Sequence, residues 1–206
     1  MKVRRRWLAV TLLVSCSGVL NAASNKGEFE MSTLDARTLQ ADLTRVTNLR
    51  LHLRDGEFRV VASDSDDITI QTQGKNHVLA KKMKVRVQQT GDFLDITFLH
   101  VPKSDCQVTI AVPKQTNLYA RMRAGDLSVD GVAGDKDLEL FAGDLSVEVP
   151  DATEYGPVDL SVRFGDVSGS PFGNPRGTVG NSLRRDGNGR YRLHAHVFAG
   201  DLTLRP

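Results

Sequence analysis

The sequence predicts an all-β protein: a parallel β-solenoid or β-helix-like stack, with an N-terminal part made of β-hairpins. Three observations support this prediction. Apolar and polar residues alternate along most of the chain, which is the period of a half-buried strand, and helical periodicity is scarce. The triplet Ala-Gly-Asp begins at Ala124, Ala133 and Ala142, in nine-residue steps. A short alternating run of the same parity follows each triplet, as expected of strands joined by regular corners.

The N-terminus has the layout of a secretory signal peptide. Residues 2–6 are mostly basic, residues 7–14 are mainly apolar, and the small residues Ala22 and Ala23 follow. The apolar run is too short to span a membrane, so we expect residues 1–23 to be a cleaved signal peptide. This predicts an exported protein, located in the periplasm or at the cell surface.

A second interpretation of the same segment stays open. Residues 13–16, Leu-Val-Ser-Cys, are similar to a bacterial lipobox, in which Cys16 would carry a lipid anchor. The signal would be short for that purpose, and Ser15 is a less usual neighbour of the cysteine than Gly or Ala. Ordinary cleavage near Ala22 or Ala23 is therefore the favoured prediction.

Composition and charge exclude some classes of function. The net charge of the whole chain is +2, but four of its 27 lysines and arginines lie in residues 1–23, which contain no Asp or Glu. The remaining 23 basic and 25 acidic residues give −2, so nucleic acid is not an expected partner. No second apolar stretch is long enough for a transmembrane helix. Cys106 is the only cysteine left after cleavage, and its apolar neighbours predict a buried small residue.

Residues 24–206 are expected to form a single all-β domain. Within its N-terminal part, residues 45–117, Asp55-Gly56 separates two alternating runs and predicts a type I′ hairpin turn. Residues 33–45 fit either a helix or a strand with a turn. The predicted strands of this part are 67–72, 82–88, 93–99 and 107–112.

The C-terminal part, residues 118–206, is predicted to be a stack of Gly-Asp coils, two nonads making about one coil of 18 residues. Gly takes a positive φ at each corner, and Asp accepts hydrogen bonds from free backbone amides. Lys136 has inward parity, and we expect its amine to reach water at a rim. Residues 168–190, rich in Gly, Pro, Asn and Arg, are predicted to form a long loop. The inward positions of the nonads are Leu127, Val129, Leu138, Leu140, Leu145, Val147 and Val149.

Three segments resemble an exported bacterial family of unknown function that is usually labelled "putative adhesin". The segments are VTIAVPKQTNLYARMRAGDLSVDGVAG at 108–134, SVRFGDVSG at 161–169 and VFAGDLTLRP at 197–206. The resemblance extends over residues 45–206 and implies a right-handed β-helix or a related all-β stack. It carries over no catalytic residues, because no such set is known for the family.

Calcium binding is the main alternative interpretation of the nonads. Calcium-binding β-rolls repeat the pattern GGxGxDxUx, in which glycine carbonyls and aspartates supply six or more oxygen ligands. Each unit here has one Gly and one Asp, without the other glycines. Asp126, Asp135 and Asp144 would be the ligands if they aligned along the stack, but aligned carboxylates repel one another without a cation. A structural corner is favoured, and neither a metal nor a cofactor is expected.

Other polar patterns are interpreted as solvated strand faces. His194 and His196 project from one side of a strand, but two imidazoles are at most half of a zinc site, and no Cys, Asp or Glu accompanies them at ligand spacing. Basic stripes can hold anionic lipid or acidic polysaccharide, although they are more often the wet side of a strand. The two stripes are Lys82, Lys84 and Arg86, and Arg121 and Arg123.

The chain contains no GxSxG, HExxH or phosphate-loop motif, and Asp64, Asp66 and Asp67 are interpreted as a turn. The sequence therefore predicts a non-enzymatic, adhesin-like binding or structural module of the cell envelope. Its expected partner is an envelope polysaccharide or another envelope protein. The alternatives are a carbohydrate-active enzyme on the same scaffold and a calcium-stabilised β-roll. Function is expected on one outward face formed by Ser128, Asp130, Asp137, Glu139, Ser146 and Glu148.

Overall fold

The computed structural model describes residues 27–30, 37–39, 47–74, 83–102, 106–173 and 180–206. The predicted signal peptide, with Cys16, lies outside these ranges. The described chain is all-β, as predicted, and its one helical element is a single 3₁₀ turn, η1 (Ala152–Glu154). No helical segment of membrane-spanning length and apolarity occurs in these ranges.

The strands form one mixed sheet that is not closed. The strands are β1 (Gly27–Glu30), β2 (Arg37–Leu39), β3 (Asn48–Ser63), β4 (Ile68–Gly74), β5 (Lys84–Thr90), β6 (Phe93–Leu99), β7 (Cys106–Pro113), β8 (Asn117–Asp130), β9 (Lys136–Ala142), β10 (Leu145–Glu148), β11 (Tyr155–Phe164), β12 (Val167–Ser168), β13 (Asn181–Arg185), β14 (Tyr191–Ala199) and β15 (Leu202–Arg205).

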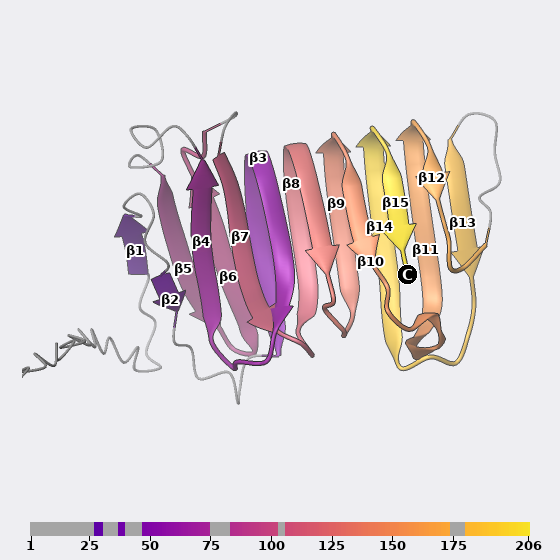
Figure 1. Ribbon diagram of the computed structural model, residues 1–206, viewed down its shortest axis with the longest axis horizontal. Helices are drawn as coiled ribbons and strands as arrows, with labels where there is room; N and C mark the ends of the chain where they lie inside the picture. Colours follow the sequence, from indigo (N-terminus) through magenta and orange to yellow (C-terminus); the bar gives the residue numbers. More distant parts are fainter. Residues whose placement is uncertain (1–26, 31–36, 40–46, 75–82, 103–105, 174–179) are drawn as a thin grey trace, which may run out of the picture.

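Strand pairing divides the sheet into two rows, one behind the other in the view of Figure 1. The first row runs β1, β5, β6, β3, β8, β9, β14, β11, β13, and the second runs β2, β4, β7, β3, β8, β10, β15, β12. The long strands β3 and β8 belong to both rows, because each turns from one row into the other at a glycine. The chain can thereby form two walls around one core.

The nonad period sets the register between neighbouring strands. Leu118 of β8 pairs in parallel with Lys136 of β9, and Leu127 of β8 pairs with Leu145 of β10. Both offsets are 18 residues, the length predicted for two nonads. Because this number is even, every paired position keeps its inward or outward direction from one strand to the next.

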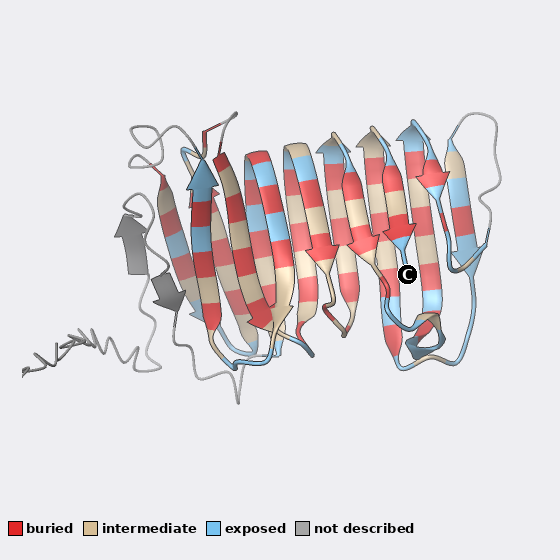
Figure 2. Cartoon of the chain, viewed as in Figure 1, coloured by how far each residue is buried: buried red, intermediate tan, exposed pale blue. Residues whose placement is uncertain are grey.

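The core lies between the two rows of strands. All seven inward positions predicted for the nonads are at most 1% exposed, which confirms the predicted parity. Figure 2 shows the resulting alternation of buried and more exposed residues along the strands. Fully burying one such Leu or Val side chain contributes roughly 1.5–3 kcal/mol before entropy is considered. Cys106 is also buried, as predicted, and burial raises the pKa of its thiol.

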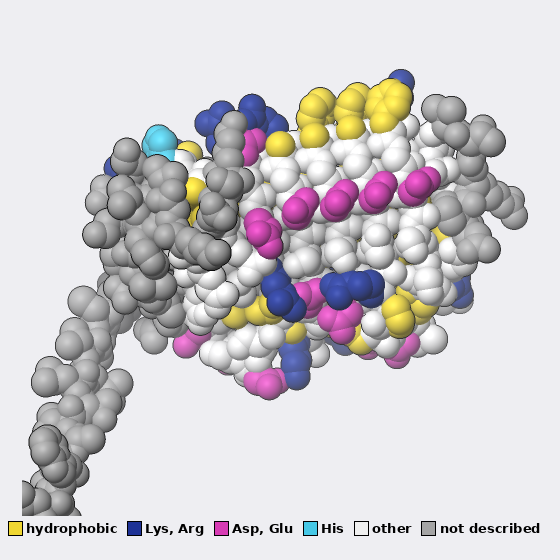
Figure 3. Space-filling view, turned by 45° about the horizontal axis from the view of Figure 1, so that its top comes forward, with side chains coloured by type: hydrophobic (Ala, Val, Ile, Leu, Met, Phe, Trp, Pro, Cys, Tyr) yellow, Lys and Arg dark blue, Asp and Glu magenta, His cyan; other side chains and the backbone are white. Residues whose placement is uncertain are grey.

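The Gly-Asp corners have the predicted local structure. Gly125 and Gly143 have φ values of 110° and 123°, and a Cβ on Gly143 would lie 2.1 Å from the carbonyl oxygen of Gly125. Only glycine permits this close stacking. Two of the aspartates accept hydrogen bonds from the next corner: Asp144 Oδ1 accepts from the backbone N–H of Asp201 at 3.1 Å, and Asp201 Oδ1 accepts from that of Asp166 at 2.9 Å. Figure 3 shows one row of acidic side chains that runs across the strands.

Asp55-Gly56 is not a hairpin turn, and that prediction is wrong. β3 continues through this pair, and Gly56 pairs in parallel with Gly125 of β8. Gly56 has the positive φ expected of a turn, 136°, but it makes a corner of the same kind as the later Gly-Asp pairs. An antiparallel hairpin is found instead around Gly91, between β5 and β6. Within the segment 33–45, the described residues form strand β2.

The C-terminal strands enter the sheet out of chain order. β14 lies between β9 and β11, and β15 lies between β10 and β12. β13 falls inside the predicted 168–190 loop and pairs antiparallel with β11, so the loop prediction is wrong for Asn181–Arg185. This strand has only one buried residue, Leu183, which is too little alternation to identify it from sequence.

Lys136 does not reach water, contrary to the prediction. The residue is 1% exposed, and its Nζ donates to the hydroxyl of Tyr155 and, at 3.4 Å, to the carbonyl oxygen of Gly134. Nζ also lies 4.5 Å from the centroid of the Tyr155 ring. Burial lowers the pKa of this amine to about 7, against the opposing charges of Asp135 and Glu154.

Candidate functional site

Three phenylalanines, Phe141, Phe164 and Phe198, form an aromatic ridge on the outer side of the neighbouring strands β9, β11 and β14. Phe141 and Phe164 are 57% and 53% exposed, and they are the large hydrophobic residues most exposed in the described chain. The Phe198 ring lies 4.8 Å from that of Phe141 in a nearly parallel orientation, and 5.5 Å from that of Phe164, edge to face. Figure 3 shows hydrophobic side chains gathered along this edge, beside the acidic row. A contiguous exposed apolar patch is a candidate for an interaction surface.

Strand register explains why the ridge forms. Ala142 of β9 pairs with Ala199 of β14, so the residues before them, Phe141 and Phe198, are also neighbours. Both phenylalanines have outward parity, opposite to the core residues of the same strands. Phe164 is the last residue of β11, where the strand meets its corner.

A shallow groove of about 460 Å³ runs beside the ridge. Phe141 and Phe198 form its apolar wall, and Arg121, Glu139 and His196 are among its polar lining residues. Apolar rings beside a few hydrogen-bonding groups are typical of binding sites for small molecules and polymers. The groove therefore offers both stacking surface and hydrogen-bonding groups to a ligand.

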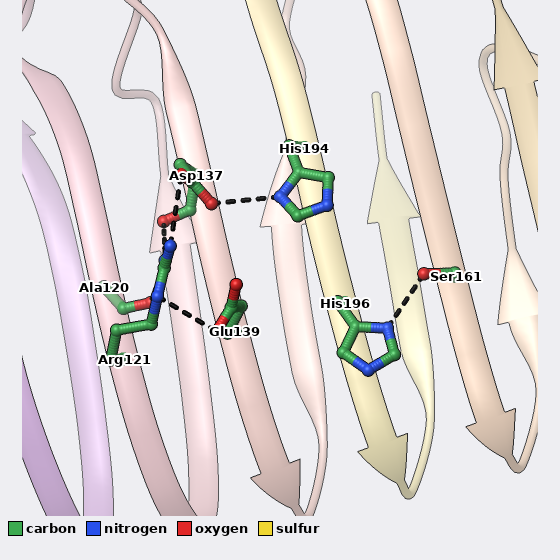
Figure 4. A network of polar contacts seen from close by, with 7 residues as sticks. All are labelled: Ala120, Arg121, Asp137, Glu139, Ser161, His194 and His196. Atoms are coloured by element: carbon green, nitrogen blue, oxygen red, sulfur yellow. Dashed lines mark hydrogen bonds and ion pairs between the residues drawn. The ribbon is translucent and has the colours of Figure 1, made fainter.

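Arg121, Asp137, Glu139 and His194 form a charged network next to this groove (Figure 4). Arg121 contacts both carboxylates: Nη2 lies 3.1 Å from Asp137 Oδ2, and Nε lies 3.0 Å from Glu139 Oε2. His194 Nδ1 lies 3.0 Å from Asp137 Oδ1. Three different strands, β8, β9 and β14, therefore contribute to one cluster.

The environment of Asp137 favours its charged form. Partial burial by itself raises the pKa of this carboxyl, but hydrogen bonds and charges from Arg121 and His194 outweigh that effect, and the pKa is lowered. The carboxylate is thus ionised at neutral pH.

His196 has a separate partner on the next strand. Its Nδ1 lies 2.8 Å from the hydroxyl oxygen of Ser161 on β11, and its backbone pairs with Glu139 on the other side. The contact with Ser161 orients the imidazole at the edge of the groove (Figure 4).

The structure separates the six outward residues that were predicted to share a face. Asp137 and Glu139 belong to β9 in the first row of strands, whereas the others belong to the second row. On that second face, Asp130 is paired with Arg59 and Arg205, each at 2.6 Å. The prediction of one common functional face is wrong, because alternate nonads lie on opposite walls.

The three aspartates of the calcium alternative do not align. Asp126 and Asp144 follow the stacked glycines of one corner, whereas Asp135 lies beside Asn117, whose Oδ1 accepts from the Asp135 backbone N–H at 2.9 Å. Asp135 Oδ1 in turn accepts from the backbone N–H of Arg192 at 2.8 Å. Consecutive nonads turn at opposite corners, which prevents the alignment.

The second basic stripe is neutralised by carboxylates. Arg121 belongs to the charged network, and Arg123 Nε donates to Asp55 Oδ1 at 2.9 Å. In the first stripe, Lys84 and Arg86 lie on β5, opposite the buried Val85, and Lys82 lies outside the described residues.

The sequence did not predict the charged network or the aromatic ridge. His194 and Asp137 are 57 residues apart and become neighbours because β14 inserts beside β9. In the folded chain, Asp137 and Glu139 lie close to His194. The expectation that no acidic residue accompanies the histidines at ligand spacing is therefore wrong. The one sequence signal for the ridge was an apolar residue at an outward position in both strands, Phe141 and Phe198.

One solved structure that shares this fold is named for cell adhesion. The structure of a "putative cell adhesion protein" from Clostridium sporogenes matches with a TM-score of 0.53 at 8% identity, covering 84% of this chain and 99% of that one. At this identity the match shows a shared fold alone. The structure of a "putative adhesin" from Bacteroides fragilis is 10% identical, and the match covers 85% of this chain and 99% of that one. Its TM-score of 0.27 is too low to show a shared fold. Neither protein-family models nor curated proteins give a match.

Proposed function

We propose that this chain is an exported, non-enzymatic, adhesin-like module of the bacterial cell envelope that binds a polysaccharide in the groove beside the aromatic ridge. The observation that carries the proposal is the stacked pair of Phe141, which is exposed, and Phe198, which is half-buried, beside Arg121, Glu139 and His196. The shared fold with a protein named for cell adhesion supports the general class.

The chemistry of the groove suits a sugar polymer. Aromatic rings pack against the apolar faces of sugar rings, while a guanidinium, a carboxylate and an imidazole hydrogen-bond to hydroxyl groups. A polymer can also follow the ridge from strand to strand, because Phe141, Phe198 and Phe164 succeed one another on three neighbouring strands.

A rigid scaffold keeps this surface in shape. We infer that the parallel coils with their stacked Gly-Asp corners form a solenoid-like wall, in which backbone pairing on both sides of β9 and β14 fixes the outward side chains. A preorganised surface loses little conformational entropy when it binds.

The proposal is tested by a glycan array with the purified protein, followed by titration of the best ligand. We expect the double variant Phe141→Ala/Phe198→Ala to bind at least about tenfold more weakly, a loss of roughly 1.4 kcal/mol. The matched control is Phe93→Ala, which removes a ring that packs on Tyr119, away from the ridge. The control should bind like the wild type.

Three results would count against the proposal. No glycan binds, the double variant binds as well as the wild type, or the control loses as much affinity as the double variant. An envelope protein that binds in a pull-down with the same dependence on the two phenylalanines would support this surface as the binding site. It would also show that the ligand is a protein and not a polysaccharide. Release of new reducing ends from a bound polysaccharide would overturn the non-enzymatic part of the proposal.

A further inference from the structure

The charged network brings three metal-ligating groups to one point on the outer face. One ligand atom from each of Asp137, Glu139 and His194 lies within 4.8 Å of the other two. All three side chains are half-buried, and they come from the neighbouring parallel strands β9 and β14. Backbone pairing fixes their Cα positions, so the set can close around an ion only by rotation of the side chains.

A cationic group already lies between the two carboxylates. The Arg121 guanidinium contacts Asp137 and Glu139 at 3.1 and 3.0 Å, and its side chain is 42% exposed. Two carboxylates this close need a positive charge between them. Arg121 Nη1 also donates to the backbone carbonyl oxygens of Asp137 at 2.9 Å and Ala120 at 3.2 Å, so a divalent ion that replaces the guanidinium must offset these contacts as well.

We propose that Asp137, Glu139 and His194 bind a zinc ion, with Arg121 as the displaceable counter-ion of the empty site. The inference shares Arg121 and Glu139 with the proposed polysaccharide groove, but its test measures zinc affinity and does not depend on the aromatic ridge. A zinc ion would lie at the polar side of the groove, where Glu139 contributes to both features.

The donor set favours zinc over calcium or magnesium. Calcium and magnesium prefer oxygen ligands alone, whereas an imidazole nitrogen with two carboxylates suits zinc. Zinc bonds of about 2.0–2.2 Å place tetrahedral ligands roughly 3.3–3.6 Å apart, so ligand atoms that now lie within 4.8 Å of one another would have to close by up to about 1.5 Å. Three protein ligands also leave a fourth position open to water or to a ligand.

Isothermal titration of the purified full chain with zinc chloride tests the site. We expect one zinc ion to bind per chain with micromolar affinity. His194→Ala and the more conservative Glu139→Gln should each weaken binding at least about tenfold, since each removes a direct ligand. Arg121→Ala should tighten binding by at least about threefold, because it removes the competing cation.

The opposite effects of these variants distinguish a zinc site from a structural ion-pair cluster. The matched control is His52→Ala, since His52 Nε2 lies 3.4 Å from Asp95 Oδ1 on the same sheet but outside the network. The control should leave zinc affinity unchanged, and circular dichroism should show that all variants are folded. Zinc binding that is absent, that survives both ligand substitutions, or that weakens in Arg121→Ala would overturn the inference.

Discussion

At the scale of single residues, Lys136 places an amine in the core at the start of β9. Its hydrogen-bond partners, the Tyr155 hydroxyl and the Gly134 carbonyl, are both uncharged. Burial therefore lowers its pKa from 10.5 to about 7. A shift of this size corresponds to a folding cost of up to roughly 5 kcal/mol when the amine is charged, at about 1.4 kcal/mol per pH unit.

This residue makes stability depend on pH. Below pH 7 the amine is protonated in the folded and the unfolded state, and folding carries the full cost of its burial. Between about pH 7 and 10.5 the folded state has already lost the proton, so the free energy of unfolding rises with pH. Lys136→Met should raise that free energy at pH 6 by about 1–4 kcal/mol, and by less at pH 9.

Urea unfolding at both pH values measures the effect of Lys136→Met. Lys114→Met is the matched control, because the Lys114 side chain is 61% exposed and should change stability little. A difference between Lys136→Met and wild type that stays the same at pH 6 and pH 9 would contradict the assignment.

At the scale of elements, the stacked glycine corners join the two walls of the stack. Gly143 lies between the corners of Gly125 and Gly200, and a Cβ on Gly200 would lie 1.9 Å from the carbonyl oxygen of Gly143. The backbones are too close there for any side chain. Each corner consequently fixes the spacing of the next one.

Gly143→Ala should destabilise the protein by at least about 3 kcal/mol, because the new Cβ would collide with the Gly125 backbone. Gly91→Ala is the matched control: Gly91 also has a positive φ, 61°, but no atom lies within 4 Å of the added Cβ. Its cost should be only about 1 kcal/mol. Guanidinium unfolding of both variants makes the comparison, and equal losses would show that φ alone, rather than stacking, requires the glycine.

At the scale of the whole molecule, the inserted C-terminal strands connect β11, β12 and β13 to the rest of the sheet. β14 is paired on one side with β9 and on the other with β11, and β15 is paired in the same way with β10 and β12. The elements from residue 155 to residue 185 are thus connected to the rest of the sheet mainly through the last 16 residues of the chain.

Deletion of residues 191–206 should therefore unfold β11, β12 and β13 while leaving β3 and β8 protected. Hydrogen exchange measured by mass spectrometry reports both regions in one experiment. If the amides of β11 keep their protection from hydrogen exchange, the dependence of β11 on the inserted strand β14 would be disproved. Replacing Arg205 with Ala in the full chain, which removes side-chain contacts to Asp130 and Ser146 but leaves the strands in place, is the control.

Much of the local structure could be predicted from the sequence. The burial of Leu127 and Val129, the positive φ of Gly125 and the 18-residue offset all follow from alternation and from the conformational freedom of glycine. These properties depend on residues near each other in the chain. The Asp55-Gly56 prediction failed because a corner and a hairpin need the same φ from glycine, and only the partner strand distinguishes them.

The candidate site could not be predicted in the same way. Its contacts between β9 and β14 join residues 57 positions apart, and they exist because the last strands insert between earlier ones. The sequence by itself determined the all-β class, the corners and the inward and outward parity of the nonads. Only the tertiary structure decided which outward side chains are neighbours, because lateral pairing depends on the packing of the whole stack and not on the local chain.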